Sequence, residues 1–261
     1  MTDESTRHDD QLWVSPLDEE HRLLFADMRV MNGHVLPWSY STPKEEREDV
    51  LTRTTVCDIS ALGKIRLSGK AADPFLFGMF DADFDALARL GAGTPATFSG
   101  EVATGEGDGM APRVEIIRSG EHEFMLLAGY DQTARVFSLL LDYAEVGDEN
   151  ALEEGQVFLS DETNALAGVC LAGKTAQSII SEMAKVGDAD APEKVANLPE
   201  FTLGFLHLDT IPTLIFHCGL TCYYLFFPVR GARVLWRGIL SFPEVEPVGF
   251  DAFSEFDILR D

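Results

Sequence analysis

Apolar residues recur along the chain with the two periodicities that distinguish strands from helices. Alternation of polar and apolar residues predicts a half-buried strand over Lys64–Ser68. Apolar residues spaced three and four apart predict amphipathic helices over Asp131–Tyr143 and Lys174–Lys185. On similar grounds we expect strands over residues 97–102, 113–118, 123–128, 157–159, 166–171, 201–207, 213–216 and 222–227, and helices over 71–80, 231–240 and 251–259.

Local signals sharpen three of the segments between these elements. Thr42 can cap a helix, the proline after it suits a first turn, and Glu45 completes a capping box, so we expect a helix from there to about Thr54. Gly105–Gly109 predicts a tight acidic turn, because its acidic residues would repel a bound phosphate. Residues 188–193 are expected to form an acidic loop.

The order of the elements indicates the fold class. Strand pairs separated by single helices, without strict alternation, favour an α+β fold with mostly antiparallel sheets. Residues 1–21 are acidic and polar, so we expect a flexible N-terminus. We expect residues 22–261 to form one folded domain, with a weak boundary near residues 187–195 as the best candidate for a division.

The uncharged stretch Thr210–Val229 is nearly as long as a membrane span, which needs about 20 mainly apolar residues. Pro212, Gly219 and Pro228 interrupt it, and its two halves are aromatic and β-branched. We therefore interpret it as two buried strands joined by a turn, and we expect no membrane partner.

Composition and charge narrow the class of partner. Of 261 residues, 46% are hydrophobic and 25% are charged, as in ordinary globular proteins, but 44 acidic residues face only 20 basic ones and leave a net charge of −24. Such a surface repels phosphate backbones, so we expect no nucleic acid partner. The acidic N-terminus does not resemble a secretory signal, and we expect a cytoplasmic protein with free thiols.

No common catalytic or nucleotide-binding motif stands out. The one cluster with metal-ligating residue types is His217-Cys218 followed by Cys222, which offers at most three ligands where a structural zinc needs four. Strand alternation also places His217 and Cys218 on opposite faces. We expect buried cysteines in a strand pair and no metal site, so the residues alone predict only an acidic α+β protein.

Four segments, in the same order, resemble the glycine-cleavage T-protein (aminomethyltransferase) family. The most specific is Val56–Ala72, which is similar to the family pattern "F-D-V-S-H-M-G-K-I-x-V-x-G-x-D-A". The other three lie within Leu159–Ala176, Gly219–Pro228 and Pro247–Gly249, so the resemblance covers roughly residues 30 to 260. Matching residues in the first segment are Asp58, Ser60, Gly63, Lys64, Gly69 and Ala72.

The resemblance implies two interleaved α+β units that bind tetrahydrofolate, and a C-terminal barrel domain that would begin where this chain ends. The positions that match a pterin pocket, and that could equally be core and turn residues, are Leu62, Met110, Gly129 and Tyr224. The family's acidic pair falls on Pro112 and Arg113, its asparagine on Gly129 and one of its glutamates on Tyr224. No catalytic residue is assigned.

Two functional hypotheses follow from this resemblance. The first is a folate-dependent aminomethyltransferase or methyltransferase of glycine cleavage and one-carbon metabolism, with a site that is degenerate or completed by a partner. The second is a non-catalytic subunit or interaction protein that resembles the gamma subunit of heterotetrameric sarcosine oxidase. Both include a protein partner, and the missing acids favour the second.

Overall fold

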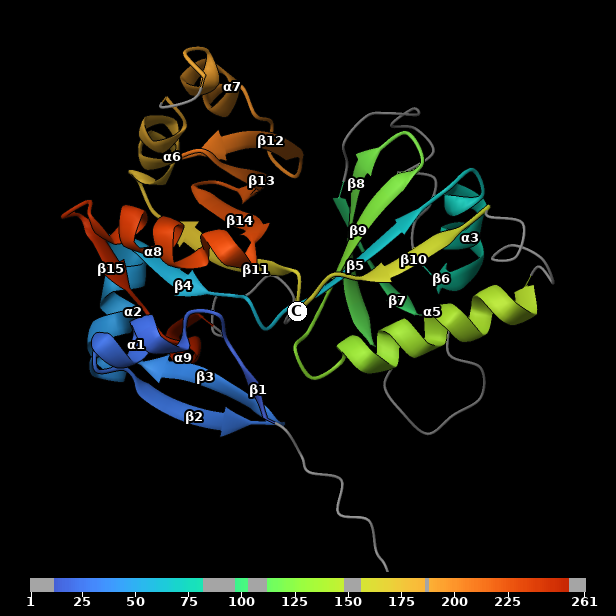
Figure 1. Cartoon of the computed structure of the whole chain (residues 1–261), viewed down its shortest axis with the longest axis horizontal. Helices are drawn as coiled ribbons and strands as arrows, with labels where there is room; N and C mark the ends of the chain where they lie inside the picture. The colour runs from blue at the N-terminus through green and yellow to red at the C-terminus, as the bar shows by residue number, and fades with distance from the viewer. Residues whose placement is uncertain (1–11, 82–96, 103–111, 148–155, 186–187, 254–261) are drawn as a thin grey trace, which may run out of the picture.

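The computed structural model describes residues 12–81, 97–102, 112–147, 156–185 and 188–253. These residues form two units, each built on a six-stranded sheet, and a small three-stranded sheet beside the first unit (Figure 1). Nearly all neighbouring strands are antiparallel, and the exceptions are β1 with β3 and β15 with β4. The predicted α+β class with mostly antiparallel sheets is therefore confirmed.

The first unit combines β4, which precedes the second unit in the chain, with the elements that follow it. Its sheet has the order β12-β13-β14-β11-β4-β15. Its other elements cover one face of the sheet and bury a core that includes Leu235 and Trp236. The elements are β4 (Thr54–Asp58), β11 (Leu166–Ala172), α6 (Ala176–Ala184), α7 (Ala191–Ala196), β12 (Leu203–Leu208), β13 (Ile211–Gly219), β14 (Cys222–Pro228), a short 3₁₀ turn (Val229–Gly231), α8 (Ala232–Leu240) and β15 (Val245–Pro247).

The second unit has the sheet order β10-β5-β9-β8-β7-β6. Two helices pack on one face of this sheet and bury residues such as Leu76 and Leu140. The elements are β5 (Gly63–Ser68), α3 (Ala72–Met79), β6 (Phe80–Asp81), β7 (Thr97–Val102), β8 (Arg113–Gly120), β9 (Glu123–Ala128), α5 (Thr133–Gly147) and β10 (Phe158–Asp161).

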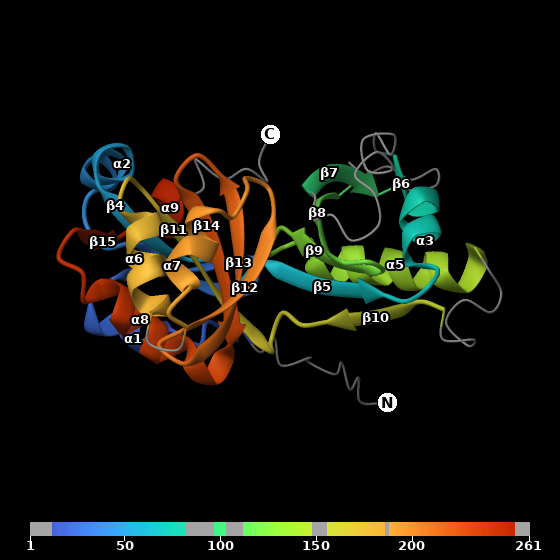
Figure 2. The ribbon, with the colours of Figure 1, turned by 90° about the horizontal axis from the view of Figure 1, so that it is seen from above.

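The second unit is inserted between the two halves of the first. The chain leaves the first unit after β4 through residues 59–62 and returns after β10 through residues 162–165 (Figures 1 and 2). The two units thus alternate along the chain. The region near 187–195, expected as a weak boundary, instead contains α7, whose Ala191 and Val195 lie in the same core as residues of α6 and β12.

The N-terminal part of the described chain is folded onto the first unit. Residues 12–21, which the sequence led us to expect as loosely held, form β1 (Trp13–Val14) and the start of α1 (Asp18–Leu23), and His21 is fully buried. The reason is a set of buried hydrogen bonds that the polar composition does not reveal. The remaining elements here are β2 (Asp27–Met31), β3 (His34–Ser39), α2 (Pro43–Thr52) and α9 (Phe250–Phe253).

Most element predictions agree with the structure, and a few differ. The capping box of Thr42 and Glu45 at the start of α2 is confirmed. The expected acidic loop at 188–193 contains the start of α7, because Pro192 suits a first helical turn. The expected turn at Gly105–Gly109 and most of the last expected helix lie outside the described residues.

The stretch Thr210–Val229 forms the predicted strand pair, with β13 and β14 hydrogen-bonded to each other. Among the described helices, none has the length and apolar character needed to cross a membrane.

Candidate functional site

Two of the residues that the resemblance matches to a pterin pocket lie where the two units meet. Leu62 lies in the crossover and Tyr224 in the middle of β14, and both are buried in one apolar cluster. Gly129 lies in the turn after β9, where its carbonyl accepts a hydrogen bond from the Thr133 hydroxyl. Met110 lies outside the described residues. The structure therefore brings two of the four residues into one cluster.

Aromatic rings surround Tyr224. Its ring centroid lies 6.1 Å from that of Phe216, 6.2 Å from that of Phe226 and 6.4 Å from that of Phe253. The space that remains beside Tyr224 is a cavity of about 60 Å³. Pockets for drug-sized ligands usually measure about 300–1,000 Å³. The described side chains thus leave a space much smaller than a typical ligand pocket.

Three of the four cysteines, Cys57, Cys170 and Cys222, line this cavity. Cys57 on β4 lies opposite Cys170 on β11 in the strand register, and the Sγ atoms of Cys170 and Cys222 are 3.6 Å apart. Cys218 lies in the same apolar cluster, at an irregularity in the pairing of β13 with β14. All four are free thiols, and Cys222 is the most exposed of them. One sheet face thus carries thiols on four neighbouring strands.

The thiols influence each other's ionisation. The neighbouring thiols of Cys170 and Cys218 interact with the Cys222 sulfur and hold the pKa of Cys222 well below its ordinary value. The same interaction, together with burial, raises the pKa of Cys170, and burial is the largest cause of the raised pKa of Cys218. Of these three thiols, Cys222 is the one whose pKa is lowered.

The ring of His217 is held by contacts outside the thiol cluster. Its ring stacks on Tyr223 at 4.5 Å, and its two nitrogens lie 3.0 Å and 3.2 Å from the carbonyl oxygens of Leu198 and Leu220. Within the described ranges, no three His, Cys, Asp or Glu side chains are placed to hold a metal ion.

The positions of the family's acidic pair lie at the start of β8. Pro112 is buried directly before this strand, and Arg113 is its first residue. A proline ring offers no carboxylate to an amide edge. Asp58, a residue of the matching motif, makes contacts of another kind.

Asp58 binds the N-terminal segment to the core. Its Oδ2 accepts a hydrogen bond from Ser15 and lies 2.8 Å from His21 Nε2, and its Oδ1 accepts one from the Ser60 backbone at 2.8 Å. The Tyr40 hydroxyl lies 2.7 Å from His21 Nδ1. Burial by itself would raise the pKa of Asp58, but the bonds from His21, Ser15 and Ser60 hold it below its ordinary value.

Lys64 fixes the crossover between the units. Its Nζ is fully buried and donates hydrogen bonds to the carbonyl oxygens of Ser60 at 2.8 Å and Leu62 at 2.7 Å. Burial lowers the pKa of Lys64 to about 8, against the opposing effect of Asp58 and Asp161. Asp58 and Lys64, which both match the family pattern, thus make buried contacts that hold the structure together.

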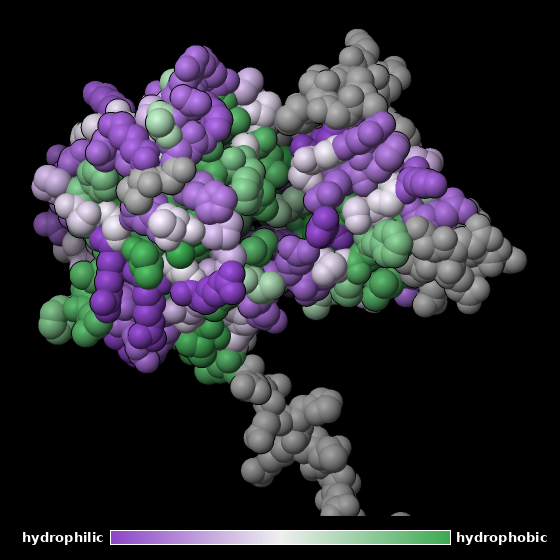
Figure 3. Space-filling view, turned by 45° about the horizontal axis from the view of Figure 1, so that its top comes forward, coloured by the Kyte–Doolittle hydropathy of each residue, from purple (hydrophilic) through white to green (hydrophobic). Residues whose placement is uncertain are grey.

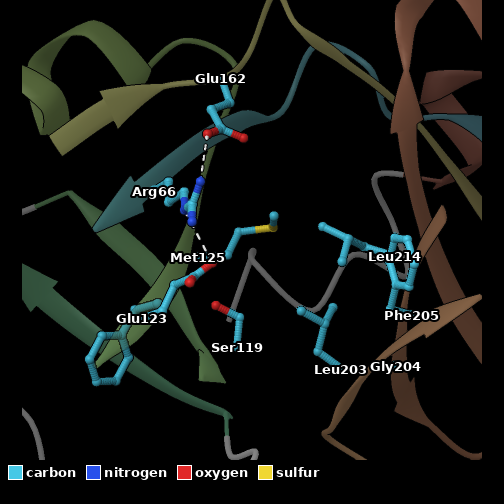
Figure 4. Close-up of a pocket in the computed structure, with 10 residues that line it drawn as sticks. Arg66, Ser119, Glu123, Met125, Glu162, Leu203, Gly204, Phe205 and Leu214 are labelled. Atoms are coloured by element: carbon cyan, nitrogen blue, oxygen red, sulfur yellow. Dashed lines mark ion pairs between the residues drawn. The ribbon is translucent and has the colours of Figure 1, made fainter. Parts of the chain in front are cut away.

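A larger groove of about 260 Å³ lies between the two units (Figure 4). On one wall, Arg66 pairs with Glu123 at 3.1 Å and with Glu162 at 4.0 Å. Sequence analysis missed this groove because its walls come from distant segments and no motif marks them. Hydrophobic residues gather in the hollow between the units (Figure 3), and the apolar wall consists of Leu203, Gly204, Phe205 and Leu214.

Known proteins resemble this chain in sequence and in fold. An aminomethyltransferase of Streptomyces coelicolor is 25% identical over 232 residues, which cover 88% of this chain and 57% of the relative. An aminomethyltransferase of Geobacillus thermodenitrificans is 25% identical over 213 residues, which cover 80% of this chain and 52% of the relative. The chain therefore spans a little over half the length of these curated relatives.

One solved structure shows the same fold. Glycine cleavage system aminomethyltransferase T from Bartonella henselae superposes with a TM-score of 0.75 and 21% identity, over 92% of this chain and 60% of that chain. A chain of heterotetrameric sarcosine oxidase from Corynebacterium gives a TM-score of only 0.49.

The family match covers most of the chain. The GCVT N-terminal domain family matches residues 17–258, which include both units and both crossovers. The protein therefore belongs to the GCVT N-terminal domain family.

Proposed function

We propose that this protein is a non-catalytic member of its family, which acts by binding a protein partner and not by transferring a one-carbon group. The packing around Tyr224 carries this proposal. Three aromatic rings surround Tyr224, and the cavity that the described residues leave beside it is about 60 Å³. A pterin would have to displace this core.

The chemistry of the lining supports the same conclusion. The family generally binds tetrahydrofolate. A buried pterin edge needs a partner for each donor and acceptor, because an unpaired buried polar group costs about 1–3 kcal/mol. The described lining is mostly apolar or thiol, with Thr55 and Tyr224 as its hydroxyl-bearing residues, and it includes no carboxylate. Pro112 supplies none at the family's acidic position.

Titration calorimetry with tetrahydrofolate tests the proposal. We expect no saturable heat from the purified protein, because the ligand cannot enter without unpacking the core. The Streptomyces coelicolor aminomethyltransferase, titrated in the same buffer, serves as the positive control. Saturable binding in the micromolar range would overturn the proposal.

The second candidate function is folate-dependent aminomethyl transfer in glycine cleavage. The names of the curated relatives favour it, since both proteins described above are aminomethyltransferases. This function would need the site to be completed by another chain or domain. Saturable binding of tetrahydrofolate in the same titration would favour this second function. A cytoplasmic location agrees with either function.

A further inference from the structure

β12 is the last strand of its sheet and pairs with β13 alone (Figure 1). A two-residue turn joins the two strands, and both turn residues, Asp209 and Thr210, have positive φ values of 46° and 71°. Such a turn closes on a hydrogen-bonded pair, here Leu208 with Ile211. Because hydrogen-bonded positions alternate along an antiparallel strand, Phe205 and His207 direct their backbone groups away from β13.

A backbone hydrogen bond just before β12 agrees with this alternation of inward-facing and outward-facing positions. The His217 backbone N–H donates to the Thr202 carbonyl at 3.0 Å, so even-numbered positions of this segment face β13. In the described part of the chain, no backbone hydrogen bond from another segment reaches Phe205 or His207. The outer edge of β12 therefore presents donors and acceptors that a further strand could pair.

The sequence of β12 does not protect this edge. Exposed edge strands usually carry a proline or a charged side chain, often lysine, which prevents pairing with a second chain. β12 reads Leu-Gly-Phe-Leu-His-Leu, and Phe205 is 59% exposed. The Phe205 and His207 rings contact each other edge-on at 5.4 Å on one side of the strand. An uncharged, apolar edge of this kind favours strand addition.

Two hollows flank the same edge. The groove of Figure 4 lies on the side that faces the second unit, and a second hollow of about 220 Å³ lies towards α7, next to Val195 and Leu198. Both hollows are lined by Gly204 and Phe205. Side chains of an added strand would alternate between its two faces, so successive residues could enter the two hollows in turn.

The charges around the groove indicate the chemistry of the added strand. Arg66 is shared by Glu123 and Glu162, which leaves one excess negative charge at the polar wall. The whole chain carries a net charge of −24, which attracts basic partners over long range. A segment that combines apolar residues with lysine or arginine is therefore complementary to this surface.

We propose that the free edge of β12 binds an extended segment of a partner protein, rich in apolar and basic residues, by β-strand addition. This inference rests on the proposed function, because it names the kind of partner that an interaction protein of this fold would bind. The main-chain bonds would be made by Phe205 and His207, and the side chains would enter the two hollows.

Selection of phage-displayed random dodecapeptides on the purified protein tests this inference. We expect enrichment of sequences in which apolar residues alternate and lysine or arginine is frequent. The best peptide is then synthesised, its affinity is measured by fluorescence polarisation, and the exchange of backbone amide protons is followed by NMR. We expect slower exchange at the amides of Phe205 and His207 in the complex.

Matched variants assign the binding to the edge. Phe205→Lys places a charge on the strand, and His207→Pro removes one outward donor without adding charge. We expect either change to weaken peptide binding at least ten-fold. Val234→Lys is the control, because Val234 is 52% exposed but lies on α8, and it should bind as the wild type does.

Three results would overturn the inference: no enrichment of basic and apolar peptides, undiminished binding by both edge variants, or unchanged amide exchange in β12. A dimer in sedimentation that Phe205→Lys dissociates would also overturn it, since the edge would then pair with a second copy. Tetrahydrofolate binding would overturn the proposed function independently of these results.

Discussion

Tyr224 occupies the position at which the resemblance implies a glutamate, and its surroundings explain the residue type. A glutamate there would place a carboxylate among Phe216, Phe226 and Phe253, where a buried charge without a partner is costly. A tyrosine adds a large apolar surface instead. The residue thus contributes to a continuous core between the two units.

Replacement of Tyr224 measures this contribution. We expect Tyr224→Ala to lower the free energy of unfolding by about 3–5 kcal/mol, the usual cost of deleting a large buried aromatic ring. Tyr224→Phe keeps the ring, and we expect a loss of only about 1 kcal/mol for the hydroxyl's interaction. Urea denaturation of the three proteins gives the values. Equal losses in both variants would show that ring packing is not what stabilises this position.

Cys222 should be the most reactive of the four thiols. Because neighbouring thiols hold its pKa below the ordinary value, its alkylation by iodoacetamide should begin at a lower pH than that of an ordinary cysteine. Mass spectrometry of peptides after short reaction times identifies the modified residue. Cys170→Ala removes one donor and should move the alkylation profile to higher pH.

Cys57→Ala is the matched control for this experiment. Cys57 lies on the same sheet face as Cys170 but is not among the groups that lower the pKa of Cys222. The profile of Cys222 should therefore stay where it is. A profile that ignores Cys170→Ala as well would contradict the proposed interaction between the thiols.

At the scale of elements, α1 shows how a short helix is held by side-chain contacts. It has six residues, Asp18–Leu23, which is too few for a helix to be stable in isolation. His21 contributes to its stability: it contacts Asp58 and Tyr40, and its ring lies 5.1 Å from that of Trp236. The buried pair between His21 and Asp58 therefore attaches α1 to β4.

The pH dependence of stability tests this attachment. The folded-state pKa of Asp58 lies below its ordinary value, so its contribution to stability is present above the ordinary aspartate pKa of about 3.9 and is lost as the pH falls through the folded value. Asp58→Asn should therefore be less stable than wild type at pH 7 and lose less stability on acidification. Urea unfolding at pH 7 and below pH 4, followed by tryptophan fluorescence, measures both effects.

A second variant separates the pair from the rest of the helix. His21→Ala leaves the buried carboxylate without its partner, and we expect a loss of about 3–5 kcal/mol at pH 7. Arg22→Ala is the control, because its ion pair with Asp18 lies on the surface and should contribute little. Similar losses in both variants would contradict a specific role for the buried pair.

At the scale of the whole molecule, the inserted unit determines which surfaces exist. The two crossovers place the sheets of the two units around a common apolar cluster that contains Leu62 and Tyr224. The same arrangement sets β12 beside the second unit and creates the groove whose polar wall carries Arg66. The filled centre and the open groove are thus consequences of one topology, and the two proposals concern these two places.

Sequence patterning by itself predicted the elements with strong local signals. The capping box at Thr42 and the amphipathic stripes of α5 and α6 depend on neighbours within one or two turns, so they are visible in the sequence. The motif Val56–Ala72 led to the family in the same way, because its residues are consecutive. The strands β2 and β3 were missed, since neither has a clear alternation of polar and apolar residues.

The tertiary structure decided what these elements form together. Only the strand register brings Cys57, Cys170, Cys218 and Cys222 to one sheet face, and only the fold joins His21 to Asp58 across 37 positions of sequence. Local patterns in the sequence record periodicity and capping, which act over a few residues. The filling of a pocket and the exposure of an edge depend on contacts between distant segments, so no local pattern could predict them.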